Sequence, residues 1–168
     1  MRIVTFNIHH GTVGSKGRVD PARLGATCAA FGADVLALQE VDVGTVRVRC
    51  ADLAAEVARA CGMVHVFAPS RRFLGGHYGN ALLVRGEVRR WAVVPLQRFP
   101  EEPRGREQRT VLAADVVVDG RPLAVLATHL AVPPSMNGPQ LDAVLDLAGR
   151  HAAPAVVLGD LNRPMDLV

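Results

Sequence analysis

The sequence predicts an α/β sandwich, in which two mostly antiparallel β-sheets pack face to face and carry helices on their outer faces. Two observations lead to this fold class. Strand-like runs outnumber helix-like runs, and helices alternate with strands only towards the two ends of the chain. The middle of the chain consists of consecutive strands, which would form antiparallel hairpins. This order fits two packed sheets better than one doubly wound sheet.

Eight apolar runs are expected to form strands, because they are short, rich in β-branched residues and leucine, and bounded by turn-forming residues. The dipeptide Asp119-Gly120 lies between two of them and is the strongest short-range signal for a β-hairpin. Residues 70–79 and 95–108 are expected to be loops. The eight runs cover residues 2–8, 35–39, 64–68, 80–84, 88–94, 110–118, 121–128 and 155–158.

Three segments are expected to be helices. Asp20 followed by Pro21 predicts an N-cap and the first helical position, and this helix ends at Gly32. The other two helices cover residues 51–61 and 140–150. In the last helix, four apolar residues are expected to face the core: Leu141, Val144, Leu145 and Ala148.

Composition places the chain among globular proteins with one domain over residues 1–168. Of its 168 residues, 49% are hydrophobic, and no apolar run is long enough to span a bilayer. The N-terminus lacks the unbroken apolar region of a signal peptide, so we expect a cytoplasmic protein. Three cysteines without a CxxC pair argue against a disulfide framework or a zinc knuckle. A net charge of +3 does not separate a nucleic-acid substrate from a small phosphoester.

The run AVVLGDLN, residues 155–162, carries the most chemical information. An apolar strand is followed by Gly159, where the backbone can approach a neighbour closely, and then by Asp160 and Asn162. Residues two apart on a strand point to the same side, so both side chains would face one site. An acid and an amide in this place suit a metal or phosphate site. A simple turn is the alternative, because Gly, Asp and Asn are the usual turn formers.

Three further strand-like runs end in residues that can bind metal or phosphate: TFNIHHG, LALQEVD and ATHL. They contribute Asn7, Glu40 and His129. Together with GDLN, GHYGNALLVR and REQRTVLAADV, these motifs resemble, in order and over nearly the whole chain, the endonuclease/exonuclease/phosphatase superfamily of metal-dependent phosphoesterases. The resemblance implies a four-layered α/β sandwich that hydrolyses a phosphate ester with a metal-activated water.

The resemblance also implies roles for the residues at the strand ends. Glu40 and Asn7 would supply oxygen ligands to a divalent cation, Mg²⁺ or Mn²⁺. His129 would bind a phosphate oxygen and stabilise the charge that develops on it. Asp160 would orient or deprotonate the attacking water, and Asn162 would hydrogen-bond the phosphoryl oxygens.

Other positions are assigned around this site. Tyr78 and Asn80 would line the substrate cleft, with a buried capping role as the alternative for Asn80. Arg109 would bind the substrate or support the site from behind. His9 stands where many relatives carry an acidic or other polar residue, and it receives no role. Four further arginines are expected to be solvated loop charges: Arg71, Arg72, Arg104 and Arg106.

The chain departs from the family pattern at its C-terminus. Family members continue beyond GDLN to a Ser-Asp-His motif whose Asp-His pair helps to activate the water, and this sequence contains no such motif. We therefore expect a domain that lacks its C-terminal strands. Two functions remain open: a divalent-metal-dependent hydrolase of nucleic acid or of a small or lipid phosphodiester, or a catalytically incomplete module that binds phosphate or a partner chain.

Overall fold

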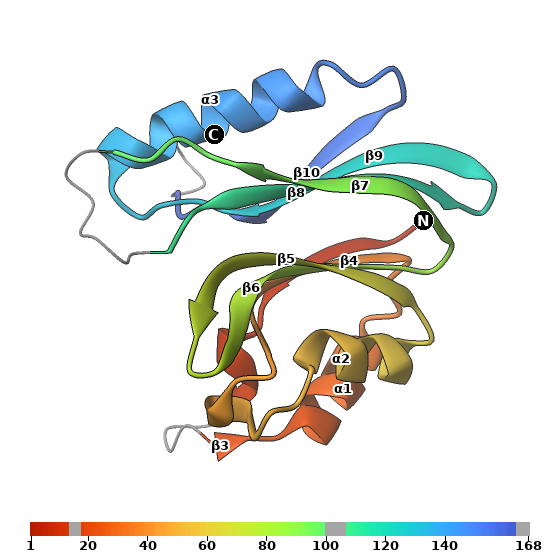
Figure 1. The fold of residues 1–168 in the computed structure, drawn as a ribbon. Helices are drawn as coiled ribbons and strands as arrows, with labels where there is room; N and C mark the ends of the chain where they lie inside the picture. The colour runs from red at the N-terminus through yellow and green to blue at the C-terminus, as the bar shows by residue number, and fades with distance from the viewer. Residues whose placement is uncertain (14–17, 100–106, 164–168) are drawn as a thin grey trace.

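The computed structural model describes residues 1–13, 18–99 and 107–163, and it shows two β-sheets packed face to face between helices (Figure 1). The layers are, in order, helix α3, the second sheet, the first sheet, and the helices α1 and α2 (Figure 1). The predicted α/β sandwich with four layers and mostly antiparallel sheets is confirmed. The helices are α1 Pro21–Ala30, α2 Leu53–Cys61 and α3 Pro134–Ala148.

The first sheet has the strand order β1-β4-β6-β5. β1 and β4 run parallel, with Asn7 opposite Gln39, whereas β6 pairs antiparallel with both β4 and β5. The parallel pair directs the chain after Asn7 and the chain after Gln39 towards the same edge. The strands are β1 Ile3–Asn7, β4 Val35–Val43, β5 Val64–Phe73 and β6 Gly76–Val84.

The second sheet has the order β10-β9-β8-β7. β10 runs parallel to β9, with Asp160 opposite His129, and the other pairs are antiparallel. The predicted hairpin at Asp119-Gly120 is confirmed, and both residues have the positive φ that such a turn needs, +49° and +74°. The strands are β7 Glu87–Pro95, β8 Thr110–Val118, β9 Arg121–His129 and β10 Ala155–Asp160.

Short elements complete the fold near the N-terminal strand. A 3-10 turn, η1 His9–Gly11, follows β1, and a second one, η2 Val46–Val48, follows β4. The two-residue strands β2 Thr12–Val13 and β3 Arg18–Val19 pair with each other. No helix among the described residues is long and apolar enough to cross a membrane.

β4 is buried on both faces, which explains its unbroken apolar run. Val35 and Ala37 belong to the core between the two sheets, whereas Leu36 and Leu38 belong to the core beneath α1 and α2. The strand that carries Glu40, β4, is therefore held by both adjoining layers.

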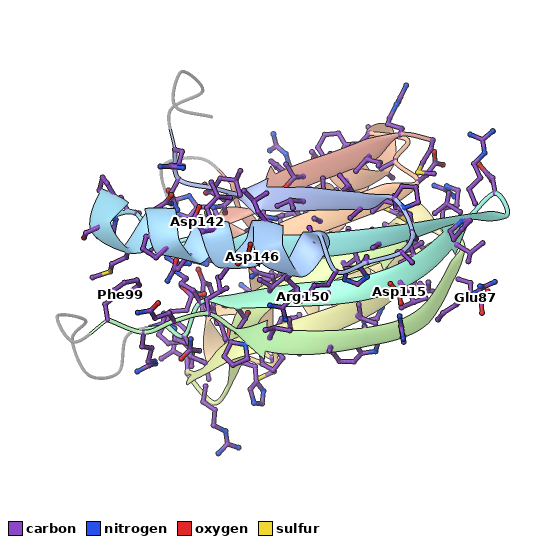
Figure 2. The ribbon with its side chains drawn as sticks, turned by 90° about the horizontal axis from the view of Figure 1, so that it is seen from above. Glu87, Phe99, Asp115, Asp142, Asp146 and Arg150 are labelled. Carbon is purple, nitrogen blue, oxygen red and sulfur yellow. The ribbon has the colours of Figure 1, made fainter. Side chains whose placement is uncertain are left out.

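α3 packs on β9 and β10 and leaves β7 uncovered on the outer face (Figure 2).

The first two helices begin at the acids that their sequences offer as caps. The side chain of Asp20 accepts a hydrogen bond from the backbone N–H of Arg23 at 3.0 Å. Asp52 accepts one from the backbone N–H of Ala55 at 2.9 Å. A cap of this kind typically stabilises a helix by about 1 kcal/mol.

The predicted loop over residues 70–79 is wrong. These residues form the facing ends of β5 and β6, which are joined by a turn at Leu74 and Gly75. Within the other predicted loop, residues 96–99 and 107–108 have no regular structure, whereas Pro95 ends β7. Arg104 and Arg106 lie outside the described residues, and Arg72 is exposed as expected.

α3 begins at Pro134, six residues before its predicted start at residue 140. Tertiary hydrogen bonds hold its first turns: Asn137 Nδ2 donates to the carbonyl of Leu161 at 2.6 Å, and Gln140 Nε2 donates to the carbonyl of Gln97 at 3.3 Å. These contacts outweigh the unfavourable Gly-Pro pair within the helix. Leu145, predicted to face the core, is 51% exposed.

We expect Gly159→Ala to lower the free energy of unfolding by about 2 kcal/mol or more, because β10 would have to move away from β9. A Cβ at Gly159 would stand 1.9 Å from the carbonyl oxygen of Thr128, and its φ is +150°. Urea denaturation measures the change. The control is Gly149→Ala at the end of α3, where φ is −65° and the new Cβ would stand 3.6 Å from the nearest atom beyond its chain neighbours, and it should change stability by less than about 1 kcal/mol. Equal stability of Gly159→Ala and wild type would contradict this packing.

Candidate active site

Three side chains from the two sheets meet through one amide. Asn7, the last residue of β1, has its Nδ2 atom 3.0 Å from Glu40 Oε1 and 3.0 Å from Asp160 Oδ2. An amide nitrogen carries two hydrogens, so it donates one to each carboxylate. The contact arises because β1 and β10 are edge strands of their sheets and lie side by side. The structure thus places Asn7, Glu40 and Asp160 at one rim of the sandwich.

Glu40 lies in a β-bulge within β4 and not at a strand end, where it was expected. The pairing of β4 with β6 shifts register between Leu38 and Val41, and Glu40 has a φ of +60°. A bulge turns a side chain out of the regular alternation of its strand. Here it lets Glu40 reach Asn7 while Val41 stays in the core.

His129 ends β9 directly beside Asp160. Its Nε2 atom lies 3.7 Å from Asp160 Oδ2, and its side chain is buried. Burial lowers the pKa of His129, the guanidinium of Arg109 lowers it further, and the Asp160 carboxylate opposes both with a smaller effect. The folded protein therefore favours a neutral imidazole, with one ring nitrogen that donates and one that accepts.

Asn162 lies beyond the end of β10, so strand alternation does not govern its direction. Its φ is +50°, and its backbone N–H donates to Asp160 Oδ1 at 3.0 Å. Its side-chain Nδ2 donates to the carbonyl of Leu130 at 2.9 Å. Asp160 thus joins the cluster at the rim, whereas Asn162 forms a turn that supports it, and a metal or phosphate site at GDLN stays a prediction.

A tight turn after β1 places two histidines beside Glu40. His9 and His10 have φ angles of +48° and +59°, and His10 Nε2 lies 3.3 Å from Glu40 Oε2. One donor atom from each of the three residues lies within 4.8 Å of the others. Burial lowers the pKa of His10, and the charge of Arg47 adds to this effect. The sequence-based roles omit both histidines, although their pairing in TFNIHHG was a signal that could have marked them.

Two arginines pack on the aromatic rings next to this cluster. Asp42, which is fully buried, accepts hydrogen bonds from Arg47 at 2.7 and 2.8 Å. The Arg47 guanidinium lies 4.8 Å from the ring centre of Phe73 and 5.9 Å from that of Tyr78. For Arg71 the two distances are 4.4 and 5.1 Å, so the prediction of a solvated loop charge is wrong for this residue.

The sequence analysis did not predict that Arg47 and Arg71 pack on these rings, because the residues meet only in the folded protein. Arg47 lies in a turn, and Arg71 lies on a strand that was predicted to end earlier. The second acid in LQEVD, Asp42, was the one local signal of the buried ion pair between Asp42 and Arg47.

Burial raises the pKa of Tyr78, so its hydroxyl group keeps its proton.

A pocket of about 240 Å³ has Arg71 and Arg109 in its wall. Glu107 separates their charges: its Oε2 lies 3.1 Å from Arg109 Nη1, and its Oε1 accepts a hydrogen bond from the hydroxyl of Ser70 at 2.8 Å. The pocket therefore combines two guanidinium groups with an apolar surface. That surface is formed by Ala131, Val132, Pro133 and Met136.

Asn80 lies inside the first sheet, on β6. It is 2% exposed and is not part of the pocket wall. Its Oδ1 atom has no hydrogen-bond partner among the described residues. Asn80 follows Tyr78 by two residues on the same strand, and both side chains are buried.

A model of the Endonuclease/Exonuclease/phosphatase family matches residues 4–168. Comparison with curated proteins gives no match. Among solved structures, an endonuclease/exonuclease/phosphatase from Beutenbergia cavernae has 28% identity and a TM-score of 0.75, over 94% of this chain and 46% of that one. The chain thus spans about half the length of that relative.

Two further structures share the fold at lower identity. TDP2 of D. rerio, humanized by 14 mutations, has 21% identity and a TM-score of 0.68, over 98% of this chain and 67% of that one. The human Nocturnin catalytic domain with bound sulfate has 19% identity and a TM-score of 0.67, over 95% of this chain and 62% of that one.

We expect the imidazole of His129 to titrate below 6.5, its ordinary pKa, in the metal-free protein. The unfolded chain then binds more protons at this position than the folded one. The resulting stability is fully present above pH 6.5 and is lost as the pH falls through the folded-state pKa. NMR titration of the ring signals, assigned with His129→Gln, measures this directly. Titration at or above 6.5 would contradict the burial of the ring.

Proposed function

This chain belongs to the Endonuclease/Exonuclease/phosphatase family, and we propose that it hydrolyses a phosphate ester with a divalent cation held at Glu40. One observation carries the proposal: Asn7 donates hydrogen bonds to Glu40 and to Asp160, which joins a cation ligand and a base at one rim. The family supports hydrolysis as the reaction class, and the roles below rest on the geometry of the chain's own residues.

Glu40 is the residue that would hold the cation. Its carboxylate is partly exposed, and divalent cations such as Mg²⁺ or Mn²⁺ bind carboxylate oxygens, so the residue fits. When bound, the cation polarises the phosphoryl oxygen and stabilises charge on the leaving group. A ligand role for Asn7 stays a prediction, because its Oδ1 accepts a hydrogen bond from the N–H of His9 at 3.0 Å. The observed role of the Asn7 amide is to hold Glu40 and Asp160 together.

Asp160 is the residue that we assign to the attacking water. Its Oδ1 accepts from the backbone of Asn162 and its Oδ2 from Asn7, so the carboxylate is fixed in orientation. A positioned carboxylate can take a proton from water, which typically contributes about 10²- to 10⁴-fold in rate. A contact between the Asn162 side chain and a phosphoryl oxygen stays a prediction, since its Nδ2 donates to Leu130.

His129 would contact the same phosphate group from the side of β9. Its ring lies next to Asp160, and its neutral form carries one N–H that can donate to a phosphoryl oxygen. A donor already aimed at an oxygen on which charge develops stabilises the transition state. This role needs the proton on the ring nitrogen that faces the substrate.

The remainder of the substrate would lie along Tyr78 and the pocket walled by Arg71 and Arg109. Guanidinium groups bind phosphate and other anions through paired hydrogen bonds. The apolar surface opposite them would accept a base, an acyl chain or another apolar substituent. A nucleic acid and a small or lipid phosphodiester both carry these features. Asn80, two residues after Tyr78 on β6, keeps its predicted role in lining the substrate cleft, with a buried capping role as the alternative.

We expect Asp160→Asn to slow hydrolysis of bis-p-nitrophenyl phosphate with Mn²⁺ by about 10²-fold or more. The amide keeps the shape of the carboxylate and loses its basicity, so Mn²⁺ affinity should stay largely unchanged. The matched control is Asp146→Asn on the outer surface of α3, away from the rim (Figure 2). A rate for Asp160→Asn equal to that of the control would contradict the role of Asp160 as base.

We expect Glu40→Gln to remove Mn²⁺ and Mg²⁺ binding in calorimetry, because the amide replaces the charged ligand of the cation. Its circular dichroism spectrum should match that of the wild type. Unchanged cation affinity would place the cation elsewhere. A wild-type chain that binds the cation but does not turn over substrate would favour the alternative function, a phosphate- or partner-binding module.

A further inference from the structure

We propose that the imidazoles of His9 and His10 join Glu40 in binding the cation, so that this site selects a transition-metal ion such as Mn²⁺ over Mg²⁺. The inference rests on the proposed function, which places a cation at Glu40, and adds the identity of its other ligands. It concerns two residues for which the sequence analysis found no role.

The three side chains already stand close to a ligand arrangement. Their donor atoms lie within 4.8 Å of one another, and His10 Nε2 is 3.3 Å from Glu40 Oε2. Ligand atoms that each stand about 2.1 Å from one ion are about 3–4 Å apart. Small rotations of the side chains would therefore close the site around one ion. Among the described residues, this is the one group of at least three histidine, cysteine or acidic residues with such spacing.

The two oxygens of Glu40 face different neighbours. Oε1 accepts a hydrogen bond from the amide of Asn7, whereas Oε2 faces the ring nitrogen of His10. A cation bound at Oε2 would therefore meet imidazole nitrogen. Imidazole is a ligand of first-row transition-metal ions, and Mn²⁺ accepts it beside its oxygen ligands more readily than Mg²⁺, which prefers oxygen alone.

The backbone of the turn is built to hold both rings in place. His9 and His10 both adopt positive φ, a region that non-glycine residues rarely occupy. Two local hydrogen bonds fix the turn. The N–H of Gly11 donates to the carbonyl of Ile8 at 2.8 Å, and the hydroxyl of Thr12 donates to the carbonyl of His9 at 2.8 Å. Strained conformations that surrounding contacts enforce are typical of ligand-binding positions.

The experiment compares Mn²⁺ and Mg²⁺ affinities by calorimetry in the wild-type chain and in the double variant His9→Asn, His10→Asn. Asparagine tolerates positive φ, so the turn should persist. We expect the preference for Mn²⁺ over Mg²⁺ to fall by about tenfold or more, the range that the loss of even an outer partner of a metal ligand produces. The control is His151→Asn, which removes a histidine paired with Asp115 away from the rim, and it should keep the wild-type preference.

Pulsed electron paramagnetic resonance of Mn²⁺ bound to the wild-type chain gives a second, independent measurement. We expect hyperfine coupling to imidazole ¹⁴N, and we expect it to vanish in the double variant. This result decides the matter even if the double variant does not fold. Bound Mn²⁺ without imidazole coupling would overturn the inference.

The failure of this inference differs from a failure of the proposed function. If Mn²⁺ and Mg²⁺ bind equally well, depend on Glu40 and support hydrolysis, the histidine ligands are refuted and the phosphoesterase stands. If the wild-type chain binds neither ion, both the inference and the cation at Glu40 are refuted.

Discussion

Two carboxylates that would repel each other are held at one rim of the sandwich by a single amide. Asn7 gives one hydrogen to Glu40 and the other to Asp160, and these residues come from different sheets. A hydrogen bond to a charged group contributes about 1.5–3 kcal/mol when buried, and less at a partly exposed rim such as this one. The same contact ties the two edge strands together and assembles the proposed chemistry. The proposed site therefore depends on one residue, which also adds a polar contact between the two sheets.

Irregular backbone is concentrated around this amide. Glu40 lies in a bulge, His9 and His10 form a left-handed turn, and Asn162 closes a turn after β10. Each such conformation in a non-glycine residue typically costs about 1–3 kcal/mol and persists only where the surrounding contacts enforce it. Regular strands would point these side chains alternately to opposite faces of a sheet. The irregularities are what gather them on one side.

The sequence predicts the regular parts of the fold well and the irregular parts poorly. Apolar runs, the cap at Asp20 and the turn at Asp119-Gly120 follow local rules, and the structure bears them out. The bulge at Glu40 depends on which residue of β6 lies opposite, which no local pattern reveals. α3 starts early because Asn137 and Gln140 bond to the distant backbone of Leu161 and Gln97, and its local sequence disfavours that start.

The residues of the candidate site divide in the same way. Motifs pointed to Asn7, Glu40, His129 and Asp160, and these four do meet. Side chains that reach the site by tertiary packing, such as Arg47 and Arg71, gave no signal of their own. Motifs in the sequence therefore reveal which polar side chains meet at the rim, whereas the residues that surround them depend on the whole fold.

The central claim is that these side chains form one cation-dependent site. The most direct test is anomalous diffraction from crystals of this chain soaked in Mn²⁺. We predict one strong anomalous peak within coordination distance of the Glu40 carboxylate. A well-occupied Mn²⁺ peak elsewhere in the molecule, with none at Glu40, would contradict the account.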